Sequence, residues 1–361
     1  NSVLVLDLNG QYVYYYEAMR NAFWGHGSMF YSWSRNLGGE MMGIFAYYLA
    51  SPFSIIVMLL PKSFILESIL IMQLCKLGAC GVTFAYYLKK SKRTGDYTTI
   101  IFSTLYAMMA YAVVQLMDPM WIDGLIYLPL IIYGTEKLID EGKKLRFIIP
   151  LALMFMANFY IGWMVGFFTF LYFVVYLFFS KKEEDISTKG LISTSIKFGV
   201  STIISIMCAA AILLPVYYSL KLGKLEFTTP DFSLKPQFVL FNFFTKLLPE
   251  SYDTVRNEGL PFVYCGTLTL FMIPLYFTNN NIEMRKKVGN GVLLTSVLLS
   301  MYLSTVDIAW HGFQVPNWLP YRYSFVFSFV MLVMAAEAFE RIEGVSYKQL
   351  GATFAGLLLY V

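Results

Sequence analysis

The sequence is dominated by long apolar runs separated by short polar connections. A helix needs about 20 mostly apolar residues to cross a bilayer. The pattern therefore predicts an all-α fold, a polytopic transmembrane helical bundle with about ten membrane segments. The apolar runs lie at residues 64–88, 99–116, 123–138, 147–158, 161–179, 198–220, 262–277, 288–303 and 321–339, and a further run begins at residue 351.

Residues 41–60 are equally apolar, but Pro52 interrupts them and Pro61 follows them. Proline removes a backbone donor and breaks a helix. We therefore expect two short amphipathic helices at the membrane interface rather than one span. This divides the chain into a first extracytoplasmic loop, residues 1–63, and a transmembrane domain, residues 64–361, with an outer loop at 221–261. We expect the chain to be a fragment of a longer polytopic protein.

Composition narrows the class of protein further. Of 361 residues, 58% are apolar and only 14% are charged, whereas a soluble domain carries about 25% charged residues. A water-soluble enzyme is thereby excluded. The net charge of +4 is too small and too scattered for a nucleic-acid partner. The four cysteines lie in or beside apolar runs without a CxxC pair, which is typical of buried small side chains.

The distribution of basic residues predicts the orientation. Short basic loops face the cytoplasm, so residues 1–63, 221–261 and 305–320 are expected outside. All six tryptophans and both histidines lie on or near that outer face. This distribution predicts that the functional site lies there. Most of the 27 Lys and Arg residues fall in connections 89–96, 136–146, 180–197, 279–287 and 340–348.

Two charged residues at the outer face carry the predicted chemistry. Asp7 lies in an apolar stretch just outside the membrane, where a partly desolvated carboxylate suits a general base; the alternative is a turn or helix-capping residue. Arg322 follows Pro320 at a helix start, where backbone N–H groups favour an anion. It is predicted to bind phosphate, and the alternative is contact with lipid headgroups.

Further polar and aromatic candidates share the outer face. His311 is predicted to assist with a phosphate or a proton, with a purely structural role as the alternative. Asp118 precedes Pro119 and is interpreted first as a helix cap. The sugar or the acceptor is predicted to contact Gln11, Tyr12, Glu40, Trp121, Asp123 and Trp310.

One basic residue, Lys76, lies inside a predicted span together with Glu67. Nine residues at 100° each place these two side chains on opposite sides of one helix. Lys76 is therefore expected to face the bundle and pair with a carboxylate from another helix.

Several segments together resemble the YfhO family of bacterial membrane proteins. They are LDLNGQY at 6–12, NLGGE at 36–40, YYLASPF at 47–53, MWIDG at 120–124, NFYIG at 158–162, PFVYCG at 261–266 and the run from Trp310 to Ser324. That family is similar to GT-C-type glycosyltransferases, which implies a GT-C-type bundle. It also implies transfer of a sugar from a polyprenyl-phosphate carrier to an extracytoplasmic cell-envelope polymer such as lipoteichoic acid.

The resemblance also implies roles and partners. Asp7 matches the acidic residue in the first external loop of such enzymes, and Arg322 matches a basic residue that meets the lipid phosphate. The expected partners are the lipid-linked donor, a teichoic-acid or polysaccharide acceptor, a polyprenyl-phosphate sugar synthase and a flippase. The expected location is the bacterial cell membrane, with several spans and an outward-facing active site. The requirement for a divalent metal stays open.

The proposed reaction is an inverting displacement at the anomeric carbon. Two other classes of function share the same aromatic residues and the same arginine. One is a flippase or transporter of lipid-linked sugars, and the other is a non-catalytic scaffold for envelope assembly. Transporters usually place charged groups near the bilayer midplane, whereas the candidates here lie at the outer surface, which favours the enzyme.

Overall fold

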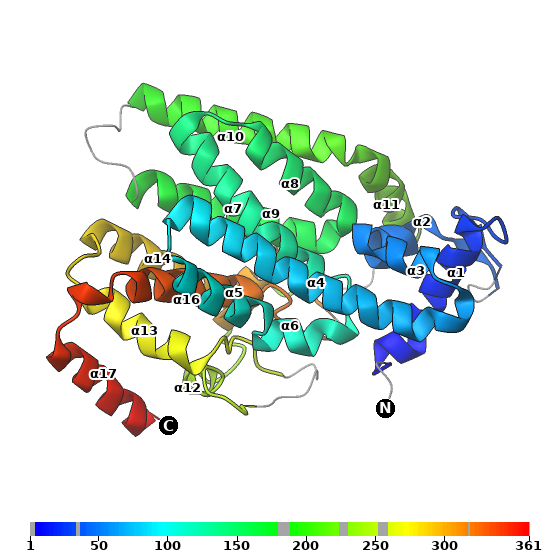
Figure 1. Ribbon diagram of the computed structural model, residues 1–361. Coiled ribbons are helices and arrows are strands. Elements are labelled where there is room, and N and C mark those ends of the chain that lie inside the picture. Colours follow the sequence, from blue (N-terminus) through cyan, green and yellow to red (C-terminus); the bar gives the residue numbers. More distant parts are fainter. Residues whose placement is uncertain are drawn as a thin grey trace.

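The computed structural model describes residues 4–33, 37–179, 188–223, 230–251, 259–316 and 318–360. Helices form nearly all of its regular structure (Figure 1). In these ranges the strands are Tyr31–Ser32 (β1) and Gly39–Glu40 (β2), which pair antiparallel with Tyr31 opposite Glu40. The prediction of an all-α fold is confirmed.

The helices form one elongated bundle. Helices α1 (Val13–Phe23), α2 (Met42–Ile44) and α3 (Ile55–Leu59) gather at one end of it, and α10 (Thr188–Cys208) runs along one edge beside α8 (Leu145–Ala157) (Figure 1). The remaining helices are α4 (Ile65–Tyr87), α5 (Asp96–Ala107), α6 (Ala110–Val114), α7 (Ile122–Glu141), α9 (Phe159–Phe179), α11 (Ala210–Gly223), α12 (Leu240–Thr245), α13 (Thr267–Thr278), α14 (Met284–Tyr302), α15 (Ser304–Trp310), α16 (Phe325–Glu340) and α17 (Tyr347–Tyr360).

The core lies around α7 and α16. Helix α7 packs against α4, α8 and α9, while α16 packs against α5, α13 and α14. Every residue of α16 from Phe325 to Ala338 is buried, as expected for a helix that is apolar on nearly all sides. These two central helices fix the positions of the residues just before them, at 118–121 and 318–324.

The prediction of about ten membrane segments is wrong, because few of the described helices are long and apolar enough to cross a membrane. Three described helical stretches, Lys62–Lys92, Phe159–Phe179 and Lys189–Cys208, are long and apolar enough to cross a membrane, or five if each of two bent pairs counts as one span. Apolar runs such as 147–158 and 262–277 form helices of only 13 and 12 residues. The run at 99–116 is bent by 42° between α5 and α6.

The two short helices predicted within residues 41–60 are confirmed. Segments Met42–Leu49 and Pro52–Leu59 meet at 97°, and the bend falls at Ser51, directly before Pro52. Their depth in the membrane, and the division of the chain at residue 63, stay predictions. The proposed outer loop at 221–261 contains α12, while its residues 224–229 and 252–258 lie outside the described ranges.

Lys76 makes the interhelical ion pair expected from the sequence. Its ammonium nitrogen lies 2.6 Å from Asp123 Oδ2, and both side chains are fully buried. Lys76 also donates to the Pro119 carbonyl at 2.7 Å, and Ser51 donates to Asp123 Oδ1 at 2.8 Å. This network ties α4 to the start of α7 and to the bend at Ser51, so it fixes the turn that carries the candidate site.

Candidate functional site

A polar and aromatic cluster lies where α7 and α16 begin. Arg322 is at its centre and is partly buried. Its guanidinium carbon lies 4.8 Å from the ring centre of Trp121 and 5.2 Å from that of Tyr160. The guanidinium donates to Tyr47 Oη at 3.2 Å and to the carbonyls of Trp318 and Leu319 at 2.8 and 3.1 Å. Aromatic faces stabilise a cation without neutralising it.

Arg322 forms no ion pair in the described part of the chain. Its bonded partners there are a hydroxyl and two carbonyls, which are all neutral. A partly desolvated guanidinium gains most from an ionised partner through charge-assisted hydrogen bonds. The arrangement therefore leaves an anion-binding capacity that no carboxylate among the described residues uses.

The backbone on both sides of Arg322 is strained. Leu319 and Tyr321 have φ angles of 55° and 56°, and Leu6, next to Asp7, has a φ angle of 46°. Bulky residues adopt this left-handed region at a cost of about 1–2 kcal/mol each, and such strain clusters at functional sites. Tyr111 fixes the strained loop by donating to the Arg322 carbonyl at 2.6 Å.

The second charged part of the cluster is a pair of carboxylates joined by a tyrosine. Tyr12 donates its hydroxyl to Asp118 Oδ1 at 2.7 Å, and the same hydroxyl oxygen lies 3.5 Å from Asp7 Oδ2. Asp118 is fully buried, and its Oδ2 has no hydrogen-bond partner in the described structure. Asp7 is only half-buried, so it is the carboxylate that a substrate can reach.

The protonation of Asp118 is set by its surroundings. Burial raises the pKa of Asp118 to about 7, because desolvation penalises the ionised form. The hydrogen bond from Tyr12 and the charge of Arg322 oppose this shift, whereas the charge of Asp7 adds to it. Asp118 therefore changes its charge near neutral pH, within the same electrostatic environment as Asp7 and Arg322.

A short turn brings the aromatic side chains of the cluster together. Asn158 separates α8 from α9, accepting from the Ile161 backbone N–H at 2.9 Å and donating to the Tyr47 carbonyl at 2.8 Å. The break between the two helices therefore falls at Asn158. It places the rings of Tyr47 and Tyr160 with their centres 5.9 Å apart.

His311 extends the cluster away from Arg322. Its Nδ1 lies 2.8 Å from the Tyr160 hydroxyl, and its Nε2 lies 3.6 Å from Asp307 Oδ1. Tyr160 therefore lies between His311 and Arg322. Trp310 is fully buried, with its ring stacked on Tyr323 at 4.2 Å, so this indole supports the wall of the cluster.

The other predicted site residues have different surroundings. Asp123 uses both carboxylate oxygens within the protein, as described above. Glu40 accepts from the Gly43 N–H at 2.8 Å and from the Ser219 hydroxyl at 2.7 Å, which caps α2 and joins it to α11. Gln11 is exposed beside Tyr12. A sugar- or acceptor-binding role of these residues stays a prediction.

Asp118, Tyr47 and Tyr160 are members of the cluster that the sequence did not assign. Asp118 looked like a helix cap because proline follows it, yet its carboxylate bonds to Tyr12, 106 residues away. No local signal reports such a contact. In the described ranges no group of three or more His, Cys, Asp and Glu side chains is placed to hold a metal ion.

Comparisons with known proteins agree with the motifs. Residues 1–361 match the family model described as "Bacterial membrane protein YfhO". A curated relative, "Uncharacterized protein YfhO" of Bacillus subtilis (strain 168), is 25% identical over an alignment 359 residues long; the match covers 93% of this chain and 38% of that protein. The chain thus spans less than half of the relative's length. No solved structure matches it.

Proposed function

Because this chain belongs to the YfhO family of bacterial membrane proteins, we propose that the cluster around Arg322 is the active site of a GT-C-type glycosyltransferase. The donor is a polyprenyl-phosphate-linked sugar. The acceptor is a hydroxyl of an extracytoplasmic cell-envelope polymer, with lipoteichoic acid as the leading candidate. The site faces outward in this proposal, because the basic loops lie at the other end of the bundle and such loops face the cytoplasm.

One observation carries this proposal. A guanidinium held between Trp121 and Tyr160, with neutral bonded partners in the described part of the chain, lies in one electrostatic cluster with the carboxylates of Asp7 and Asp118. Sugar transfer from a phosphate carrier needs both elements. A cation stabilises the departing phosphate, and a carboxylate removes the proton of the attacking hydroxyl.

These positions support the following reaction. Asp7 accepts the proton of the acceptor hydroxyl while that oxygen bonds to the anomeric carbon. The bond from that carbon to the phosphate oxygen breaks, and the lipid phosphate leaves with the electron pair, held by Arg322. Attack opposite to the leaving group inverts the anomeric centre. Asp118 is a positioning residue, because it holds Tyr12 away from Asp7 when it is ionised.

A transporter or flippase of lipid-linked sugars needs the arginine but no base. Such proteins usually place their charged groups near the bilayer midplane. The buried ion pair of this bundle, Lys76 with Asp123, is neutralised within the protein. The Arg322 guanidinium, which has no ion pair among the described residues, and the reachable carboxylate of Asp7 instead lie at the end where α7 and α16 begin. This supports an enzyme over a transporter or a passive scaffold.

Arg322→Ala is expected to weaken binding of the lipid-linked donor about 10- to 100-fold, because it removes charge-assisted hydrogen bonds of about 1.5–3 kcal/mol. The measurement is donor binding to the full-length protein in detergent. Arg20→Ala is the matched control, since Arg20 lies in the first predicted outer loop, residues 1–63, and donates to the Leu60 carbonyl. Equal donor affinity of Arg322→Ala and Arg20→Ala would argue against the phosphate-binding role.

The transfer rate is expected to fall as the pH drops below about 7. With its pKa raised to about 7, Asp118 is half protonated near that pH and becomes increasingly neutral below it. Neutral Asp118 attracts the Tyr12 proton less, so the hydroxyl turns to Asp7 and makes it a weaker base. Asp118→Asn fixes the neutral state. Its rate is expected to be low and independent of pH between 6 and 8, and an unchanged wild-type pH profile in this variant would exclude the positioning role.

A further inference from the structure

A cavity of about 340 Å³ lies at the other end of α7. From Trp121 to Glu136 the helix rises by about 22 Å at 1.5 Å per residue, so this cavity is separate from the Arg322 cluster. Its walls are α7, α9, α14, α16 and the turn Leu88–Lys92 that follows α4. Its volume lies within the range of small-ligand sites.

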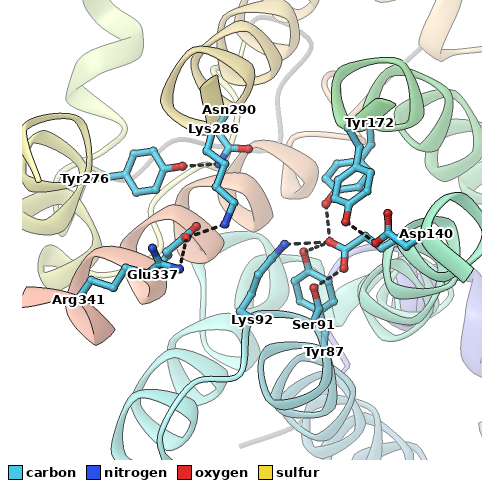
Figure 2. A network of polar contacts seen from close by, with 12 residues as sticks. Tyr87, Ser91, Lys92, Asp140, Tyr172, Tyr276, Lys286, Asn290, Glu337 and Arg341 are labelled. Carbon is cyan, nitrogen blue, oxygen red and sulfur yellow. Dashed lines mark hydrogen bonds and ion pairs between the residues drawn. The ribbon is translucent and has the colours of Figure 1, made fainter. Parts of the chain in front are cut away.

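Two polar networks face each other in this cavity (Figure 2). In the first, Glu136 accepts from Tyr172 at 2.6 Å, Lys92 at 2.9 Å and Tyr87 at 3.1 Å, and also from Ser91. Each oxygen of this carboxylate is therefore used. The wall that carries Glu136 is fixed before any ligand arrives.

In the second network, Glu337 is shared by two cations (Figure 2). Lys286 donates to it at 2.9 Å, and Arg341 Nη2 lies 3.3 Å from the same oxygen. Beside them Asn290 donates to the Tyr276 hydroxyl at 2.7 Å. One carboxylate cannot neutralise two cations, so this side of the cavity keeps a positive charge.

The lining as a whole is positive. Its carboxylates are Glu136, Asp140 and Glu337, and its cations are Lys90, Lys92, Arg93, Lys137, Lys286 and Arg341. Lys137 pairs with Glu141, which lies outside the lining and is shared with Lys143, so Lys137 is left out of the count. Five cations then remain against three carboxylates, and in the described ranges Lys90 and Arg93 pair with none of them.

Arg93 is held at the mouth of the cavity by a strained backbone. Its φ angle is 56°, a conformation that costs a residue with a Cβ about 1–2 kcal/mol. Its N–H bonds to the Leu88 carbonyl and ends the helical turn there. Arg93 is exposed, and a guanidinium suits phosphate through bidentate hydrogen bonds.

We propose that this cavity is a binding site for a phosphate-bearing ligand. Lys286 and Arg93 bind the phosphate, Lys90 screens its remaining charge at the mouth, and Tyr176 and Phe329 line the space for the rest of the ligand. Several cations that converge on one cavity suit a group with more than one negative charge better than a single carboxylate. The site lies at the basic end of the bundle, away from the proposed transfer reaction.

The phosphate has two sources, the headgroup of an anionic lipid or a soluble phosphorylated compound. Thermal unfolding of the full-length protein in a neutral detergent distinguishes them. One arm adds phosphatidylglycerol against phosphatidylcholine, and the other adds inorganic pyrophosphate against chloride at equal ionic strength. We expect at least one anionic probe to raise the wild-type melting temperature by several degrees, and the probe that does so identifies the source.

Three variants test whether the shift in melting temperature depends on the residues of this cavity. Lys286→Gln leaves Glu337 paired with Arg341, and Arg93→Gln changes only an exposed side chain, so both are expected to fold. Each should lose at least half of the shift, whereas Lys144→Gln, an exposed lysine at the same end that does not line the cavity, should keep it. No shift with either anionic probe, or equal shifts in all three variants, would overturn the proposal.

Discussion

Replacing Asp7 by asparagine is expected to slow sugar transfer by about 100-fold or more, the usual contribution of a general base being about 10²–10⁴-fold. Asparagine keeps the size of the side chain but does not accept the proton of the acceptor hydroxyl. Donor binding should be nearly unchanged, because Arg322 holds the phosphate. The assay follows labelled sugar from polyprenyl phosphate into the acceptor, with the full-length protein in detergent.

Glu17→Gln is the matched control for this experiment. Glu17 lies on α1, close to Asp7 in the chain, and pairs with Lys62 at the surface. It should transfer sugar at the wild-type rate. Full-rate transfer by Asp7→Asn would remove Asp7 as the base. A transporter has no hydroxyl to deprotonate, so a wild-type protein that moves the donor across a bilayer without forming product would favour that alternative.

Lys76→Met is expected to destabilise the fold by about 3–5 kcal/mol, the usual cost of removing one partner from a buried ion pair. The substitution keeps most of the length of the side chain but leaves Asp123 buried without its cationic partner, with the Ser51 hydroxyl as its remaining side-chain donor in the described ranges. The measurement is equilibrium unfolding in mixed micelles. The turn at Pro119 also loses a hydrogen bond from Lys76, so donor binding should fall as the turn loosens.

The double variant Lys76→Met/Asp123→Leu separates charge from packing. With both charges gone, the uncompensated carboxylate disappears, and most of the lost stability should return. Lys62→Met, which removes a half-exposed surface pair with Glu17, should change stability by less than about 1 kcal/mol. A double variant as unstable as Lys76→Met would mean that packing of the lysine stem dominates over its charge.

The features that the sequence predicted well are governed by local geometry. Helical periodicity placed Lys76 inside the bundle and away from Glu67, and Pro52 predicted the bend that separates two short helices. The partner of Lys76 did not follow from the sequence, because Asp123 reaches it only through the packing of α7 on α4.

The prediction of about ten membrane segments was wrong for a physical reason. Counting apolar residues does not detect where a helix ends, since hydropathy is the same on both sides of a bend. The run 99–116 reads as one segment, yet the backbone turns between Ala107 and Ala110. The runs at 123–138 and 288–303 belong to helices whose ends carry clustered charges.

The candidate site was predicted in part. Four residues predicted from the sequence lie in one cluster, namely Asp7, Tyr12, Trp121 and Arg322. Their roles there stay predictions. Asp118 was missed because its partner is distant in sequence, and the stacking of Trp121 on Arg322 has no sequence signature. Such contacts depend on where α7 and α16 begin relative to each other, which only the folded bundle determines.

The most direct measurement is the structure of the full-length protein in a lipid nanodisc with a polyprenyl-phosphate sugar and no acceptor. The account predicts phosphate density against the Arg322 guanidinium, with the sugar between it and Asp7. A phosphate bound elsewhere, with Arg322 still stacked between Trp121 and Tyr160 and free of ligand, would contradict it.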